Sequence, residues 1–309
     1  MEVLSPSSKA LKDLYQPVAT VGSFDGLHLA HQAILKEVDR RAKRIQGHGL
    51  IVTFNPHPRI VLDKSEAPAL LTTLEEKLDL LKKQPIDYTL VWPFSRQLAV
   101  WPASRFVQEI LWKKLGVREM VIGHDHAFGH DRAGRLRTLE DLGKRYHFKV
   151  TAIDPVLYGS DPISSTRIRR CLLTGDVVSA SEMLGHPYEL EGCVVRGDGR
   201  GRRLQYPTAN LSISGRKLIP GDGVYAVRWK RPSDSPGGLV NIGVRPTFDG
   251  KKRTLEIHFL DFRGSLYGEK VRVQFIQKIR DEKKFTSGRE LMTQMKKDEQ
   301  AARRLLSAG

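Results

Sequence analysis

The sequence predicts an α/β domain with a parallel sheet, followed by a small antiparallel β-barrel that is closed by a C-terminal helix. In the first half, short apolar runs alternate with segments of helical periodicity. From about residue 185 onward, β-prone runs are separated by glycine and proline without intervening helices. A chain of 309 residues also exceeds what one hydrophobic core usually serves. We therefore expect two domains, 1–183 and 184–309.

Five short apolar runs in the first domain are candidate strands: Pro17–Val21, Gly49–Phe54, Asp87–Trp92, Gly116–Ile122 and Phe148–Ile153. Between them lie three segments of helical character: His31–Ile45, Thr72–Lys83 and Arg105–Leu115. Thr72 precedes Glu75 by three residues, which indicates a capping box at the start of the second helix, and Pro102 stands where the first residue of the third is expected. Strands that alternate with helices predict a parallel sheet with right-handed crossovers.

The second domain contains β-prone runs separated by turn residues: Glu189–Arg196, Val224–Trp229, Leu239–Ile242, Thr254–Leu260 and Val271–Ile276. Short strands with turn signals between them indicate a small antiparallel barrel or sandwich. The final stretch, Ser287–Leu306, is polar and carries Leu291, Met295, Ala302 and Leu305 at helical spacing. This pattern predicts the closing helix.

Charge limits the classes of partner. The net charge is +16, with 26 basic and 21 acidic residues in 1–183 and 25 basic and 14 acidic residues in 184–309. Nucleic acid, acidic membranes and phosphorylated small molecules all fit such an excess. However, the basic residues are scattered in pairs and triplets, and no basic stripe is interleaved with aromatic residues, which make up 7% of the chain. We expect neither a nucleic-acid partner nor a membrane partner.

The compartment follows from what the sequence lacks. It has no run of about 18 apolar residues and no signal-peptide core near Met1. Two cysteines, Cys171 and Cys193, are too few for a disulfide framework and fit a reducing environment. We expect a cytoplasmic protein.

The first chemical motif follows the first strand, at 22–31. Gly22 and Gly26 flank a turn in which a helix begins, and a helix N-terminus presents free N–H groups to an anion. His28 and His31 share one face of the first helical turn, where two imidazoles can stabilise a leaving pyrophosphate. The alternatives are two ordinary surface histidines or a zinc site, although the pattern lacks the glutamate of an H-E-x-x-H motif.

Three more motifs follow strands of the same sheet or open a helix. Asn55 and His57 lie at the end of the second strand, and residues 123–129 follow the fourth. The carboxyl edge of an open α/β sheet is where ligands bind, although His57 between two prolines also suits a rigid turn. Residues 163–169 place three hydroxyls and two arginines at a helix start, as a clamp on polyphosphate would.

The second domain carries its own polar constellation. A glycine-punctuated hairpin, 191–203, is suited to wrapping phosphates or to forming a plain turn. Thr208 and Asn210 alternate on one strand and offer the oxygen ligands that Mg²⁺ prefers. Glu256 lies within an otherwise apolar strand, where it is either a general base or an outward-facing residue.

Taken together, these motifs resemble the bacterial bifunctional riboflavin kinase/FAD synthetase family. The first domain matches in G-x-F-D-G-x-H-x-x-H, T-F-N-P-H-P and I-S-S-T-R-I-R, and the second in P-T-A-N at 207–210 and N-I-G-V-R-P-T at 241–247. The resemblance implies a Rossmann-like nucleotidylyltransferase domain at 1–183 and a riboflavin kinase β-barrel at 184–309. It implies the conversion of riboflavin to FMN and of FMN to FAD, with ATP as co-substrate and Mg²⁺ as cofactor.

The resemblance also implies site residues, each carried over from a matching motif. The implied catalytic residues are His28, His31, Arg169 and Glu256. The implied ATP site of the adenylyltransferase comprises Gly22, Phe24, Asp25, Gly26, Ser164, Ser165 and Thr166. The implied flavin-binding residues are Asn55, Asp125, Phe128 and Arg280. The implied ATP loop of the kinase comprises Gly192, Gly197, Gly201 and Arg202, with Thr208 and Asn210 at the metal.

Three positions depart from the family pattern. Ala30 replaces a glycine between the two histidines, His126 stands where the family tends to have phenylalanine, and Gln205 replaces a glycine before P-T-A-N. Because two of these departures fall in the first domain, the alternative prediction is a riboflavin kinase with a weak or retargeted adenylyltransferase domain.

Overall fold

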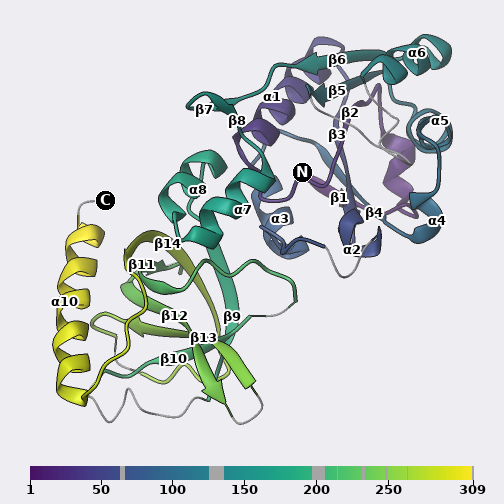
Figure 1. Cartoon of the computed structure of the whole chain (residues 1–309). Coiled ribbons are helices and arrows are strands. Elements are labelled where there is room, and N and C mark those ends of the chain that lie inside the picture. The colour runs from purple at the N-terminus through teal and green to yellow at the C-terminus, as the bar shows by residue number, and fades with distance from the viewer. Residues whose placement is uncertain are drawn as a thin grey trace. The chain divides into compact units, whose positions relative to one another are not determined.

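The computed structural model describes residues 1–62, 67–124, 136–196, 206–213, 215–231, 234–247, 250–262 and 264–307, without the side chains of 245–252. The chain divides into two compact units, 1–165 and 166–309 (Figure 1). Each unit is described by itself below.

The first unit is built on a six-stranded sheet in the order β1-β4-β3-β2-β5-β6. All neighbouring strands are parallel, as predicted. The strands are β1 (Glu2–Leu4), β2 (Val18–Val21), β3 (Gly49–Asn55), β4 (Tyr88–Pro93), β5 (Glu119–Gly123) and β6 (Lys149–Ile153). Five of them match the predicted runs to within three residues at each end. The prediction missed β1, which is too short to show a period.

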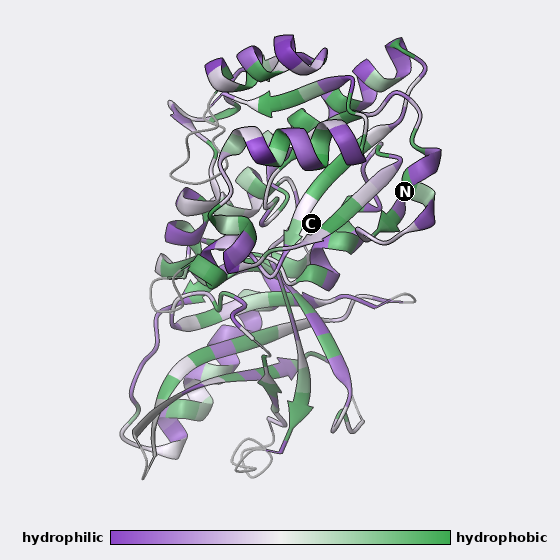
Figure 2. Ribbon diagram, turned by 90° about the vertical axis from the view of Figure 1, so that its right-hand side faces the viewer, coloured by the Kyte–Doolittle hydropathy of each residue, from purple (hydrophilic) through white to green (hydrophobic). Residues whose placement is uncertain are grey.

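Helices cover both faces of this sheet. They are α1 (Leu29–Arg44), α2 (Pro58–Leu62), α3 (Leu74–Leu81), α4 (Arg96–Ala99), α5 (Ala103–Phe106) and α6 (Leu136–Tyr146), with the 3₁₀ helix η1 (Lys9–Asp13) and the π-helix η2 (Val107–Lys114). A short hairpin, β7 (Leu157–Tyr158) and β8 (Asp161–Pro162), follows β6. The strands are hydrophobic over most of their length, whereas the helices alternate in hydropathy (Figure 2).

The alternation of side chains along β2 shows how the two faces are filled. Ala19 and Val21 pack with residues of α5, η2 and α6. Val18 points to the other face and packs with residues of α1 and with Leu81 of α3. Successive side chains of a strand point to opposite faces, so the sheet is buried on both sides. This is the three-layer α/β arrangement that the sequence predicts.

Two predicted helix starts are wrong by one residue. The capping box at α3 is formed by Thr73 and Glu76, not by Thr72 and Glu75. Pro102 is the N-cap of α5 rather than its first helical residue.

The second unit begins at Thr166, the second residue of α7 (Ser165–Thr174). It continues with α8 (Val177–Leu184) and a closed barrel in the order β10-β13-β12-β11-β14-β9. All barrel pairs are antiparallel. The strands are β9 (Glu189–Val195), β10 (Ala209–Ser212), β11 (Gly223–Trp229), β12 (Gly237–Thr247), β13 (Gly250–Phe259) and β14 (Lys270–Arg280), and α10 (Gly288–Ser307) follows. The predicted barrel and its terminal helix are confirmed.

The terminal helix packs on the outer surface of the barrel. Ala302 of α10 is fully buried in a cluster with Val224, Leu239 and Leu260. The neighbouring residues Tyr225 and Val240 point the other way and are also fully buried. None of the described helices is both long and apolar enough to cross a membrane.

Candidate active sites in the two compact units

The first unit holds a cavity of about 900 Å³ at the carboxyl edge of its sheet. Val21, Phe54 and Gly123, which lie at or near the ends of β2, β3 and β5, line it. The chain runs outward from β2 to β3 and β4 on one side, and to β5 and β6 on the other. The pairing of β2 with β5 ends at Ala19 and Met120, so the strands separate below the cavity. Ligands of open α/β sheets bind at such a point of reversal.

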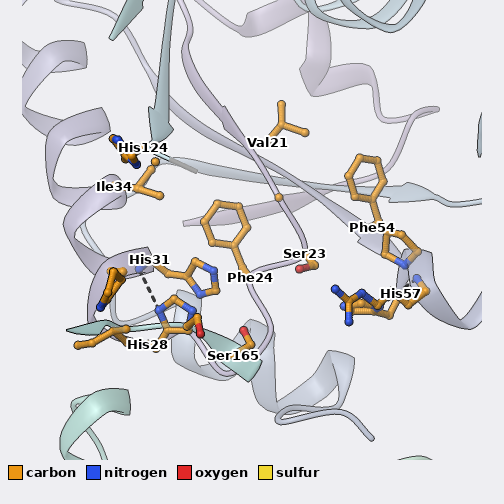
Figure 3. A pocket seen from close by; sticks show the side chains of 18 of the residues that line it. Val21, Ser23, Phe24, His28, His31, Ile34, Phe54, His57, His124 and Ser165 are labelled. Carbon is orange, nitrogen blue, oxygen red and sulfur yellow. Dashed lines mark hydrogen bonds between the residues drawn. The ribbon is translucent and has the colours of Figure 1, made fainter. Parts of the chain in front are cut away.

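The two histidines of the first motif lie together in this cavity. His28 is the N-cap of α1, and its Nδ1 accepts a hydrogen bond from the backbone N–H of His31 at 3.4 Å. The two rings are stacked with centroids 3.6 Å apart (Figure 3). Nδ1 of His31 is buried and has no hydrogen-bond partner among the described residues. Burial, with smaller effects of His28 and Lys77, lowers the pKa of His31 well below its usual value.

Asp25 is buried beneath the turn rather than exposed to the cavity. It is 1% exposed, and its carboxylate accepts hydrogen bonds from the backbone N–H groups of Leu71 and Thr72. The Thr72 hydroxyl also donates to Asp25 and accepts from the Gly26 N–H at 3.1 Å. Among the described residues that line the cavity, neither Asp25 nor Gly26 is found. Both residues therefore hold the turn to the segment that leads into α3.

Four of the five other residues implied for the ATP site of the adenylyltransferase line this cavity: Gly22, Phe24, Ser164 and Ser165. The hydroxyl of Ser165 donates to the Asp25 carbonyl oxygen at 3.0 Å, which ties the serine pair to the turn. Asn55 is exposed at the end of β3, while its neighbours Phe54 and His57 line the cavity.

Several implied residues fall elsewhere. Thr166 and Arg169 belong to the second compact unit, where α7 carries them. Asp125, His126 and Phe128 lie outside the described residues.

Sequence reasoning missed some residues at this site. Lys77 is 5% exposed on α3 and donates from Nζ to the Ser23 carbonyl oxygen at 2.6 Å. No spacing rule marks it, because it is one of many lysines in amphipathic helices. Asp154 and Trp101 also line the cavity. Asp154 directly follows β6, and a polar residue at the carboxyl end of a parallel strand could have been predicted to lie at the ligand-binding edge of the sheet.

In the second unit, the barrel brings together the residues of the predicted metal and base site. In the strand register, Glu256 of β13 lies opposite Asn210 of β10 and opposite Asn241 of β12. The Thr208 hydroxyl donates to Oε2 of Glu256 at 3.4 Å. Leu255 is buried and Glu256 half-buried, so this group lies on the face opposite the barrel interior.

As ligands for a metal ion, Thr208, Asn210 and Glu256 offer oxygen atoms only. In the part of the chain that the structure describes, no three His, Cys, Asp or Glu residues are grouped closely enough to hold a metal ion by themselves. A hydroxyl, an amide oxygen and one carboxylate suit a hard cation that keeps water or substrate phosphate as further ligands. The donor set fits a metal that arrives with a nucleotide.

Two other implied kinase residues have structural contacts. A Cβ at Gly192 would lie 2.5 Å from the Ser212 carbonyl oxygen, so the close approach of β9 and β10 requires glycine. Arg280 donates from Nε and Nη2 to Asp298 of α10, with a shortest distance of 2.8 Å. Gly197, Gly201, Arg202 and Gln205 lie outside the described residues.

The fold and the two sites define a class: a nucleotide-binding α/β domain joined to a β-barrel whose outer face carries a carboxylate beside a threonine and an asparagine. Two family models match the chain, FAD synthetase over residues 11–167 and riboflavin kinase over residues 184–306. The bifunctional riboflavin kinase/FMN adenylyltransferase of Escherichia coli strain K12 is 37% identical over 287 residues, or 93% of this chain and 91% of the relative. The chain belongs to the bifunctional riboflavin kinase/FMN adenylyltransferase family, as the motifs predict.

Two further comparisons cover nearly the whole chain. The protein of the same name from Haemophilus influenzae is 35% identical over 304 residues, 98% of each chain. A solved structure described as a macrolide-efflux protein from Streptococcus pneumoniae has a TM-score of 0.86 at 32% identity and covers 98% of this chain and 99% of that chain. The similarity thus extends to the arrangement of elements in both units.

Proposed function

We propose that this protein phosphorylates riboflavin to FMN with its barrel and adenylylates FMN to FAD with its parallel-sheet domain, each time with ATP. The observation that supports the proposal is that residues from three motifs of the first domain, such as His28, His57 and Ser164, line one sheet-edge cavity. In the second unit, Thr208 of P-T-A-N donates a hydrogen bond to Glu256. We assign the adenylyltransferase to 1–183 and the kinase to 184–309; the start of the riboflavin kinase match at residue 184 supports this division.

In the adenylyltransferase reaction, a phosphate oxygen of FMN attacks the α-phosphorus of ATP in line, and pyrophosphate leaves. His28 and His31 stabilise the charge that develops on the departing phosphates. Gly22 and Phe24 shape the nucleotide site. Asp25 and Gly26 hold its turn in place. The remaining proposed residues are Ser164, Ser165, Thr166 and Arg169 for ATP, and Asn55, Asp125 and Phe128 for the flavin.

In the kinase reaction, Glu256 accepts the proton of the riboflavin 5′-hydroxyl as that oxygen attacks the γ-phosphorus of ATP, the bond from this phosphorus to the bridging oxygen breaks, and ADP leaves. Membership of an ATP-using family implies a divalent metal ion, and we propose Mg²⁺, held by Thr208 and Asn210. When bound, this ion would neutralise phosphate charge. We assign Gly192, Gly197, Gly201 and Arg202 to the ATP loop, and Arg280 to the border of the flavin site.

The proposal also accounts for the composition. Every substrate except riboflavin is a phosphate ester, so the net charge of +16 needs neither a nucleic acid nor a membrane partner. Both cysteines are free, which supports a reducing, cytoplasmic location.

The test is to incubate the purified protein with riboflavin, ATP and Mg²⁺ and to separate the flavins by chromatography over time. The proposal predicts FMN first and FAD later. In His28→Ala, FMN formation should persist while FAD formation is lost. FMN that accumulates without FAD, even after fresh ATP is added, would favour the alternative of a kinase with a weak or retargeted adenylyltransferase domain. No flavin product at all would refute the proposal.

A further inference from the structure

Lys77 is a buried cation to which the proposed reaction gives no role. Lys77 lies on α3 of the first unit and is 5% exposed. Its Nζ donates to the Ser23 carbonyl oxygen at 2.6 Å, and the same oxygen accepts from the Thr53 hydroxyl at 3.3 Å. A buried ammonium is unfavourable unless it is paired or faces an anion, so its position beside the phosphate-binding turn calls for an explanation.

The segment that carries Lys77 already holds the turn at two further points. The carboxylate of Asp25 accepts from the N–H groups of Leu71 and Thr72, and the Gly26 N–H donates to the Thr72 hydroxyl. A complete capping box at Thr73 fixes the start of α3. The start of the helix that carries Lys77 is therefore fixed relative to the turn.

The charge of Lys77 reaches the histidine pair. After burial and His28, Lys77 is the third cause that lowers the pKa of His31, so its ammonium lies within electrostatic range of that ring. Burial also lowers the pKa of Lys77 itself, while Asp25 raises it. The charge of Asp25 is in turn shared among several N–H and O–H donors.

The hydrogen bonds to the Ser23 carbonyl oxygen indicate what this charge does. Ser23 lines the cavity, and an unengaged carbonyl oxygen there would present a negative dipole to incoming phosphates. Lys77 and Thr53 both bind that oxygen. Ser23, His28 and His31 all line the cavity (Figure 3).

We propose that Lys77 is a positioning residue for phosphate binding in the adenylyltransferase site: it engages the Ser23 carbonyl oxygen and places a buried positive charge behind the turn that receives the triphosphate and holds the pyrophosphate product. This inference rests on the proposed adenylyltransferase function. A purely structural lysine would alter stability alone, whereas Lys77 sets the affinity for phosphates.

The test uses the full chain and inorganic pyrophosphate as the probe, with binding measured by calorimetry. Lys77→Met removes both the charge and the hydrogen bond, whereas Lys77→Gln keeps a donor and removes the charge. Pyrophosphate binding should weaken about tenfold in Lys77→Met and about threefold in Lys77→Gln, the scale of a charge-assisted hydrogen bond. In FAD synthesis, the KM for ATP should rise by similar factors, with a smaller change in kcat.

Two controls separate this effect from damage to the fold. Lys82→Met changes an exposed lysine at the end of the same helix, paired with Asp79 at 3.4 Å, and should change neither binding nor KM. FMN formation by the same samples reports on the barrel and should stay at the wild-type rate. If Lys77→Met does not fold, the pyrophosphate affinity of Lys77→Gln tests the inference by itself.

Equal pyrophosphate affinity in the wild type and in Lys77→Gln would overturn the inference, and so would a wild-type protein that does not bind pyrophosphate. A wild-type protein that makes no FAD yet binds pyrophosphate in a Lys77-dependent way would contradict the proposed function while supporting the role of Lys77. The two failures are thus distinct.

Discussion

Replacing Asp25 separates two roles that its motif allows, contact with ATP and support of the turn. The residue is 1% exposed and accepts hydrogen bonds from the N–H of Leu71 at 3.0 Å and from the N–H and hydroxyl of Thr72 at 3.0 and 3.2 Å. Asp25→Asn keeps one acceptor oxygen, loses the charge and turns an NH₂ group toward donors. Asp25→Ala leaves all three donors without this acceptor.

The size of the effect follows from these contacts. A hydrogen bond to a charged group contributes about 1.5–3 kcal/mol, and losses within one network are not additive. We therefore expect the free energy of unfolding of the first unit to fall by about 2 kcal/mol in Asp25→Asn and by about 4 kcal/mol in Asp25→Ala. Since domains are stable by about 5–15 kcal/mol, both variants should be folded without denaturant.

Urea unfolding followed by tryptophan fluorescence measures this loss. Trp92, Trp101 and Trp112 lie in the first unit and Trp229 in the second, so the signal reports mainly on the first. Asp39→Asn, which breaks a surface pair with Lys43, is the control and should change stability by less than about 1 kcal/mol. An unchanged urea midpoint together with a raised KM for ATP would refute the reasoning and make Asp25 a nucleotide ligand.

The other predictions concern both units. Glu256→Gln should abolish FMN formation but leave FMN-to-FAD conversion intact, as chromatography would show; loss of both activities would argue against separate sites. Because burial lowers the pKa of His31 in the folded protein well below its usual 6.5, the unfolded chain binds more protons as the pH falls through that usual value. Stability should therefore fall as the pH drops from about 7.5 to about 5.5, and His31→Asn should flatten that dependence of the urea midpoint; an equal slope in both proteins would exclude the effect. Gly192→Ala should destabilise the barrel by about 1–3 kcal/mol, because the new Cβ meets the backbone oxygen of Ser212. At the matched Gly243→Ala, the three atoms nearest the new Cβ belong to the flexible carboxylate end of Glu282, so this variant should melt near the wild-type temperature; similar losses in both variants would contradict the steric argument.

The fold could be predicted because it depends on periodicity. Buried parallel strands such as β3 are continuous apolar runs, and the barrel strands are bounded by glycine and proline, so both signals are local. The placement of the motifs followed directly, since the carboxyl ends of parallel strands lie at one edge. For the same reason, β1 could not be found: three residues carry no period, and only its pairing with β4 makes it a strand.

The capping box shows why local rules fail at single residues. The sequence T-T-L-E-E offers two frames, Thr72 with Glu75 and Thr73 with Glu76, and spacing cannot choose between them. In the structure, the Thr72 hydroxyl is already bonded to Asp25 and to the Gly26 N–H, so Thr73 caps the helix. A contact across 47 residues thus decides a local register.

The same contact explains why the first motif acts as one unit. Its residues divide into those that line the cavity, such as His28 and His31, and those such as Asp25 that are buried against the start of α3. A spacing pattern treats both kinds alike, because both are required at fixed positions. Their difference lies in how a substitution reaches the chemistry: loss of a lining residue removes a group that faces the cavity, whereas loss of a buried residue such as Asp25 acts through the position of the turn. Lys77 belongs with the motif in our proposal although it lies 46 residues beyond His31. Its ammonium donates to the Ser23 carbonyl oxygen and so holds the same turn that Asp25 and Thr72 hold.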